Sequence, residues 1–257
     1  MESEKQEFGE GLYERLSADF HSDGLDYKNI MKIERHLDSS LEQMVNRDSI
    51  KDILNDVSGI FRSVGDFVHS EINVFAYPVR DFTGLSYAEF SAKKLSDIID
   101  SSVSRFSPEE LALLEKDIKQ TSYLLIKDKG IVYVKDVNDA DDVRKIFKPV
   151  HSSYSGEEAE AEIIDKAAKA SSLGIKAHLS VLLHSYKLDK KRKRKLPIGY
   201  FHLTKKTEFS DFDFWLVNRI VTHSAAIIDG YLFNLQERKK EKERIDALTE
   251  DAFKHYL

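Results

Sequence analysis

Residues 175–203 decide the fold, because they contain two runs in which apolar and polar side chains alternate. The first run reads Ile175-Lys176-Ala177-His178-Leu179-Ser180-Val181-Leu182-Leu183, and the second reads Leu196-Pro197-Ile198-Gly199-Tyr200-Phe201-His202-Leu203. Alternation with a period of two is typical of a β-strand with one face in the core. A charged turn joins the runs, so the stretch predicts two neighbouring strands of an antiparallel sheet, over 175–186 and 196–203.

The alternation also divides the side chains between the two faces of the sheet. On the strand at 175–186 one face carries Ala177, Leu179, Val181, Leu183 and Ser185, and the other carries His178, Ser180, Leu182, His184 and Tyr186. On the strand at 196–203, Ile198, Tyr200 and His202 share a face. A further strand is predicted over 72–79, where Ile72, Val74 and Ala76 oppose Asn73, Phe75 and Tyr77. We expect the aliphatic faces to pack against helices.

The mixed polar and aromatic faces suit a pocket with an aromatic lining and a few polar anchors. The candidate ligand-binding residues are Phe75, Tyr77, His178, Ser180, His184, Tyr200 and His202. The alternative is that these side chains face water or a covering loop. Imidazoles of His178, His184 and His202 could in principle bind zinc, but no carboxylates with suitable spacing accompany them, so no metal site is predicted. The cofactor is left unassigned.

Helices are predicted at both ends of the chain. The first begins at Asp26 and has a narrow apolar stripe: Ile30, Ile33, Leu37, Leu41, Met44 and Val45. Such a stripe suits a helix–helix seam, either with a second chain or with this chain's own terminal helix. The last helix starts at a Ser210 cap and runs to about Arg244. Roughly 30 helical residues extend about 45 Å, so its end should project from the sheet.

Further elements are predicted between these ends. A second helix follows a cap at Asn46 or Asp48, and helical spacing of apolar residues extends over 91–105. Ser107-Pro108-Glu109-Glu110 starts another helix. The runs 123–126 and 131–134 flank a Gly-ended turn and predict a hairpin. A short helix over 139–147 and an Ala-rich helix over 157–172, ended by Gly174, complete an α+β pattern with helices on both faces of the sheet.

The composition excludes several classes of function. The 257 residues contain no cysteine, which excludes disulfides, thiolate metal sites and cysteine nucleophiles. No apolar run is long enough to span a membrane, and the polar start of the chain is unlike a secretory signal, so a cytoplasmic protein is expected. The sequence has no phosphate-binding glycine loop, nucleophile elbow or zinc-protease motif, so an enzyme is not predicted.

The charge is uneven along the chain. Six of the 39 basic side chains lie at 190–195, so the rest of the chain is more acidic than the net charge of -6 indicates. A single basic cluster argues against a general nucleic-acid binder, which needs a broad basic face. We interpret the cluster as a solvated hairpin tip; an acidic partner, a membrane headgroup and nuclear targeting are the alternatives.

The segment 175–228 resembles the closing half of a GAF domain. Ile198-Gly199 matches the Ile-Gly pair of that family, Lys205 or Lys206 its lysine, Phe209 its phenylalanine and Asp213 its aspartate. Thr204 stands where the family has asparagine, and Phe214 where it has a second acidic residue. The set is complete in members that bind cyclic nucleotides.

The resemblance implies a GAF-like antiparallel sheet and a sensory role. It divides the chain into an N-terminal helical extension (1–47), a sensory domain (48–235) and a C-terminal signalling helix (236–257). A small ligand, with a cyclic nucleotide as one candidate, would act through a homodimer of the terminal helices on an output domain or protein. The alternative is a ligand-free dimerisation or protein-interaction module.

Overall fold

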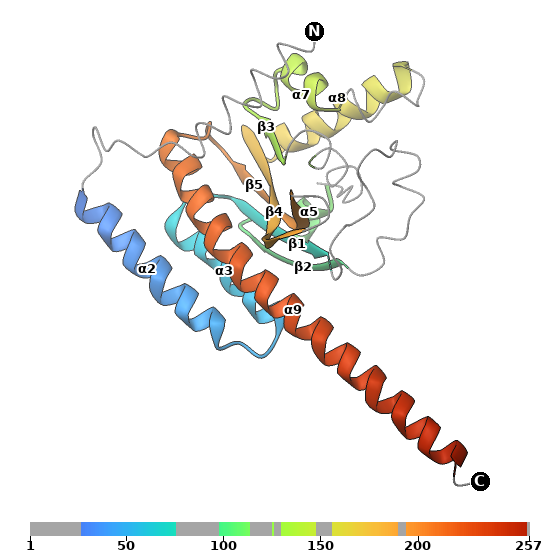
Figure 1. Cartoon of the computed structure of the whole chain (residues 1–257). Helices are drawn as coiled ribbons and strands as arrows, with labels where there is room; N and C mark the ends of the chain where they lie inside the picture. The colour runs from blue at the N-terminus through green and yellow to red at the C-terminus, as the bar shows by residue number, and fades with distance from the viewer. Residues whose placement is uncertain are drawn as a thin grey trace.

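A five-stranded antiparallel sheet forms the centre of the chain (Figure 1). The computed structural model describes residues 27–75, 98–113, 125, 130–147, 156–189 and 194–255. The strands are β1 (His69–Phe75), β2 (Ile98–Ser104), β3 (Ile131–Val134), β4 (Ala177–Asp189) and β5 (Arg194–Lys205). They lie in the order β2-β1-β5-β4-β3, and each neighbouring pair is antiparallel. The predicted α+β class is therefore confirmed.

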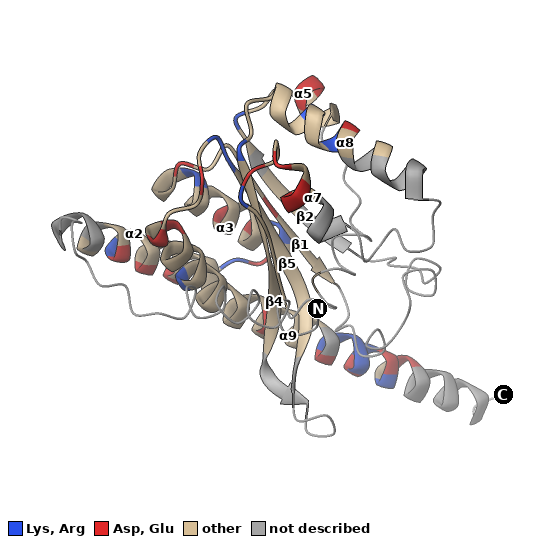
Figure 2. Ribbon diagram, turned by 90° about the horizontal axis from the view of Figure 1, so that it is seen from above, with Lys and Arg blue, Asp and Glu red and all other residues tan. Residues whose placement is uncertain are grey.

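Helices cover both faces of this sheet, as predicted (Figure 2). The helices are α2 (Tyr27–Val45), α3 (Ile50–Val64), α5 (Pro108–Leu113), α7 (Ala140–Phe147), α8 (Gly156–Ser172) and α9 (Asp211–His255). On one side lie α2, α3 and α9, and on the other lie α7 and α8. Several ends carry the expected caps: Glu110 N donates to Ser107 Oγ, and Gly174 after α8 has a φ of 69°. At α3 the cap is Ser49, which replaces the predicted Asn46 or Asp48.

The main core lies between the aliphatic sheet face and α2, α3 and α9. The strands contribute Ile72, Val74, Ala177, Leu179, Val181, Leu183, Phe201 and Leu203, all buried. Leu37 and Met44 of α2 belong to the same core, so the narrow stripe of α2 packs on its own chain. A smaller core of Val68, Val134, Val137, Val143 and Ile175 joins the opposite sheet face to α7 and α8.

The 45-residue α9 extends well beyond the sheet (Figure 1). At 1.5 Å per residue it is about 68 Å long. Among the side chains of this helix that the structure describes, Leu232 is the last buried apolar one, and Phe233, Leu235 and Ile245 are exposed. The predicted projecting end of the last helix is therefore observed.

Three local predictions were wrong. The segment predicted as helix over 91–105 contains β2, which pairs with β1 along its whole length. Of the predicted first hairpin strand, 123–126, only Leu125 lies within the described residues, and it is helical; β3 pairs with β4 instead. Ile198 does not share a face with Tyr200 and His202, because a β-bulge opposite Leu183 and His184 leaves it out of the register and places it in the main core.

Candidate ligand-binding face

The sheet face opposite the main core carries a cluster of polar side chains from three adjacent strands. We call it the polar patch: His69, Glu71 and Asn73 of β1, His202 and Thr204 of β5, and His178 and Ser180 of β4. The strand register aligns these residues in rows across the sheet. Thr204 of β5 pairs with His69 on one side and with His178 on the other, and His202 of β5 pairs in the same way with Glu71 and Ser180. Paired residues point to the same face, so the seven side chains lie together.

The patch is internally bonded and mostly buried, with only His178 and His202 partly exposed. Ser180 Oγ lies 2.8 Å from His202 Nδ1, and Asn73 Nδ2 donates to Glu71 Oε1 over 2.8 Å. Glu71 Oε2 lies 3.5 Å from His69 Nε2, and both side chains are only 4% exposed. The His202 ring centre is 5.4 Å from that of His178 and 6.4 Å from that of His69. The side chains therefore form one connected layer.

Three polar atoms of this layer have no hydrogen-bond partner. They are His69 Nδ1, Asn73 Oδ1 and Thr204 Oγ1, on residues that are 3%, 0% and 3% exposed. Buried polar atoms are nearly always hydrogen-bonded in folded proteins, because leaving one unpaired costs about 1–3 kcal/mol. Three unmet atoms on one face mark a place where an external group can bond.

His178 is neutral at physiological pH. The pKa of His178 is lowered to about 3, first by burial of the ring among protein atoms and second by the neighbouring His202. The residue as a whole is still partly exposed to solvent. The patch therefore gains no positive charge from this ring at pH 7.

This shift predicts a pH-dependent stability. Unfolded His178, with a pKa near 6.5, binds a proton below that pH, whereas the folded residue stays neutral down to about pH 3. Stability is thus lost as pH falls through this window. Between pH 7 and pH 5 the wild type should lose up to about 2 kcal/mol more unfolding free energy than His178→Gln. Urea unfolding at both pH values measures this. The exposed His223→Gln should follow the wild type, and equal losses in all three proteins would contradict the prediction.

The structure brings together some of the residues predicted from the sequence. His178, Ser180 and His202 lie in the patch, and Phe75 and Tyr200 adjoin it with ring centres 6.4 Å apart. His184 lies beyond Leu182, beside Gly130. Tyr77 lies outside the described residues.

Four patch residues were not predicted as site residues: His69, Glu71, Asn73 and Thr204. The strand predicted over 72–79 begins three residues after the observed start of β1, so it excludes His69 and Glu71. The signal was present, because His69, Glu71, Asn73 and Phe75 alternate with Ser70, Ile72 and Val74. From the sequence, Thr204 stands out only as a departure from the GAF pattern.

A buried ion pair lies on the other face of β5, next to Thr204. Lys205 Nζ donates to both oxygens of Asp213, over 2.8 and 2.7 Å, and the side chains are 8% and 4% exposed. Ser210 donates its backbone N–H and hydroxyl to Asp213 Oδ2. Lys205 Nζ also lies 5.7 Å from the ring centre of Phe67 and 6.0 Å from that of Phe209. Lys205, and not the exposed Lys206, is thus the lysine that pairs with the first turn of α9.

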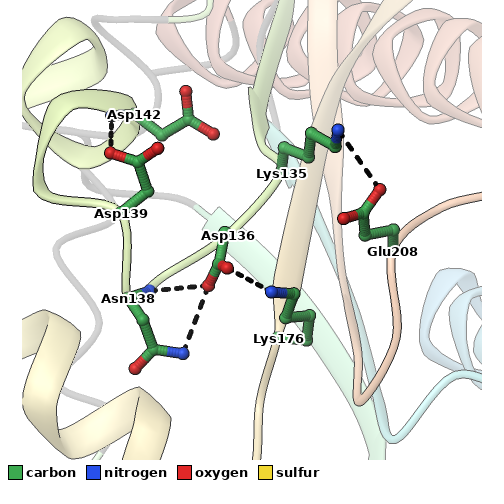
Figure 3. Close-up of polar contacts among 7 residues, drawn as sticks. All are labelled: Lys135, Asp136, Asn138, Asp139, Asp142, Lys176 and Glu208. Carbon is green, nitrogen blue, oxygen red and sulfur yellow. Dashed lines mark hydrogen bonds and ion pairs between the residues drawn. The ribbon is translucent and has the colours of Figure 1, made fainter.

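Two lysines at the β3 and β4 ends are also paired (Figure 3). Lys176 binds Asp136, which lowers the pKa of the Asp136 carboxyl and raises that of Lys176. Asn138 adds a backbone N–H bond to the same carboxyl. Lys135 lies 3.4 Å from Glu208. These cations are held by acids at the edge of the sheet.

The described residues contain neither a candidate metal site nor a candidate membrane span. No group of three or more His, Asp or Glu side chains there is arranged to hold a metal ion. No helix in the described part of the chain is long and apolar enough to cross a membrane.

The solved structures similar to this chain include a GAF domain region and chromophore-binding domains of bacteriophytochromes. No protein-family model matches the chain, and no curated protein sequence matches it.

Three individual structures illustrate the likeness. The chromophore-binding domain of a bacteriophytochrome from R. palustris is 10% identical, with a TM-score of 0.43; the match covers 84% of this chain and 64% of that one. The corresponding domain from Stigmatella aurantiaca is 11% identical, with a TM-score of 0.40 and coverage of 82% and 62%. A GAF domain region from Geobacter sulfurreducens is 13% identical, with a TM-score of 0.34 and coverage of 77% and 97%. The chain thus spans less than two thirds of both bacteriophytochrome chains.

Proposed function

We propose that this chain is a GAF-like sensory domain that binds a small organic ligand on the polar patch. The observation that carries the proposal is the set of three buried atoms without partners, His69 Nδ1, Asn73 Oδ1 and Thr204 Oγ1. A ligand that bonds to them removes their desolvation cost, and binding energy arises from that difference. The aromatic pair Phe75 and Tyr200 supplies an apolar flank to the same face.

The strand β5 offers a route from the ligand to the last helix. Thr204 faces the patch, and its neighbour Lys205 faces the opposite side, where it holds Asp213 in the first turn of α9. Ser185 of β4 adds a second link, since its hydroxyl donates to Asp229 of α9 over 3.0 Å. A ligand that prefers one position of β5 would therefore bias the position of α9.

The projecting part of α9 would deliver the signal to an output partner. Beyond Leu232 this helix leaves the core, and its exposed residues include Phe233, Leu235 and Ile245. Self-association through the terminal helices is part of the proposal. Since the stripe of α2 is used within the chain, the second copy would contact α9.

The test uses a variant that separates ligand binding from folding. Because Thr204 Oγ1 has no partner, Thr204→Val should leave the unliganded protein unchanged or more stable, by up to about 1 kcal/mol. Any compound from a metabolite library, cyclic nucleotides included, that raises the melting temperature of the wild type should lose at least half of its effect in Thr204→Val and in Asn73→Ala. Thr222→Val, on the exposed surface of α9, is the matched control.

Two results would contradict the proposal. One is a library in which no compound stabilises the wild type. The other is a set of stabilising compounds that act equally on Asn73→Ala and on the wild type. The second candidate function, a dimerisation module without ligand, is favoured by the exposed apolar residues of α9. In that case light scattering would show a stable dimer whose mass does not respond to any compound.

A further inference from the structure

The projecting part of α9 continues the core-facing side of that helix beyond the core (Figure 1). Within the core part, Ile228 is fully buried and Tyr231 packs against the main core. The same alternating spacing of four and three residues leads on to Leu235, Arg238, Lys242 and Ile245. Residues with this spacing lie along one side of a helix. We call these four residues the distal seam, and all of them are exposed.

The charges on the other side of this stretch are paired within the helix. Lys240 Nζ lies 2.7 Å from Glu237 Oε1, and an Arg244 guanidinium nitrogen lies 4.0 Å from Glu241 Oε2. Pairs three residues apart stabilise a helix and leave that side close to neutral, although both charge signs are present along the described part (Figure 2).

The distal seam itself has cations in the middle and apolar side chains at its ends. Arg238 and Lys242 occupy the two inner positions, and Leu235 and Ile245, which are 40% and 53% exposed, occupy the outer ones. The neighbouring Lys239 and Asp246 have opposite charges, so together they do not change this balance. The seam is therefore basic between two apolar ends.

A second copy of this chain does not complement the distal seam. In a parallel pair of helices each seam residue meets its own copy, so Lys242 would face Lys242 and Arg238 would face Arg238. In an antiparallel pair Arg238 would face Lys242. Both arrangements place like charges at the centre of a helix interface, where they repel each other and lose water. Self-association of α9 is therefore confined to the part before Arg238.

The surface of an anionic membrane does not complement the seam either. Helices that lie on a membrane keep their apolar residues on one face and their cations on the opposite, polar face. Here Arg238 and Lys242 lie between Leu235 and Ile245 on the same side of the helix, so the apolar residues cannot enter the membrane without the cations. A helix that offers acids at the centre of its own seam matches both features.

We infer that the distal seam binds an acidic amphipathic helix of the output partner, with carboxylates against Arg238 and Lys242 and apolar side chains against Leu235 and Ile245. Opposite charges across a helix seam select the partner, and like charges reject a second copy. The apolar ends keep water away from the charged pairs. The inference rests on the proposed function, because it gives the chemistry of the output partner, but its test needs no ligand.

Two synthetic helical peptides of about three heptads test the charge preference. Both have leucine at the outer seam positions, and they have either glutamate or lysine at the two inner ones. Fluorescence anisotropy with the full chain at about 0.15 M salt measures their dissociation constants. The glutamate peptide should bind at least about tenfold more tightly than the lysine peptide. Arg238→Glu/Lys242→Glu should reverse this preference.

The control variant makes the same change of charge on the other side of the helix. Lys240→Glu/Arg244→Glu alters two exposed cations outside the seam, so the glutamate peptide should still bind more tightly. Equal binding of the two peptides, or binding of neither, would overturn the inference. A preference that both double variants reverse would also overturn it, because the net charge of α9, and not the seam, would then select the partner.

Two further measurements test the other occupants. Light scattering should show that Arg238→Leu/Lys242→Leu strengthens self-association at least about tenfold, because the like charges are gone. No increase would overturn the argument against a second copy. Tighter binding of the wild type to vesicles with anionic lipid than to the glutamate peptide would assign the seam to a membrane. Since no compound is present, a chain that fails to respond to ligands can still show the peptide preference, so the two proposals fail separately.

Discussion

Asp213→Ala is expected to lower the free energy of unfolding by about 3–5 kcal/mol. The change leaves the Lys205 ammonium buried between the rings of Phe67 and Phe209 without its two carboxylate acceptors. It also deprives the Ser210 N–H and hydroxyl of their acceptor at the start of α9. Urea unfolding followed by circular dichroism measures the loss.

Two controls show whether the loss comes from an uncompensated charge. In the double variant Lys205→Met/Asp213→Leu both charges are removed, and most of the stability should return, because apolar residues of similar size replace buried ion pairs well. Glu208→Ala breaks the ion pair between Lys135 and Glu208, whose side chains are 60% and 49% exposed, respectively. This variant should lower the free energy of unfolding by less than about 1 kcal/mol. If Asp213→Ala cost no more than Glu208→Ala, the buried pair would not anchor α9.

The sequence predicts best those strands in which apolar residues alternate with polar ones because every second side chain is buried in the core. In β4 and β5, Leu179, Val181, Phe201 and Leu203 all enter the main core, so their spacing records the burial directly. The end of α8 also predicts well, since Gly174 adopts the positive φ that glycine tolerates best. These signals are local.

The strand β2 could not be predicted because its structure depends on a distant partner. Leu95, Ile98, Ile99 and Val103 have helical spacing. The strand is fixed instead by pairing with β1, from which 22 residues separate it in the sequence. A hydrogen bond of 2.6 Å from Ser101 Oγ to Asn55 Oδ1 also ties it to α3. Strand preference depends on such context more than helix preference does.

The site was predicted in part for a similar reason. His178, Ser180 and His202 were found because they alternate with core residues of β4 and β5. Asn73 Oδ1 and Thr204 Oγ1 lack hydrogen-bond partners. This is a property of the assembled sheet, because it depends on which groups lie near these atoms in space. A sequence pattern contains the donors and acceptors but not their partners.

Gly199→Ala is expected to destabilise the protein by about 1–3 kcal/mol, because an added Cβ atom would clash with the backbone of β1. A Cβ atom there would lie 2.2 Å from the Asn73 carbonyl oxygen and 3.0 Å from Val74 Cα. Both are backbone atoms of the paired strand, so relief requires β1 to move away from β5. That movement would displace the Asn73 side chain, and ligand-induced stabilisation should fall together with the unfolding free energy.

Gly59→Ala is the matched control, because it makes the same chemical change where there is room. A Cβ at Gly59, inside α3, has no atom within 4 Å, so the substitution should raise stability by about 0.5–1 kcal/mol through helix propensity. The two glycine variants should therefore differ in sign. Equal effects would mean that β1 can shift without cost, and then the position of Asn73 would not be fixed by its contact with β5. Opposite signs, together with a loss of ligand-induced stabilisation in Gly199→Ala alone, would show that the pairing of β1 with β5 positions the polar patch for ligand binding.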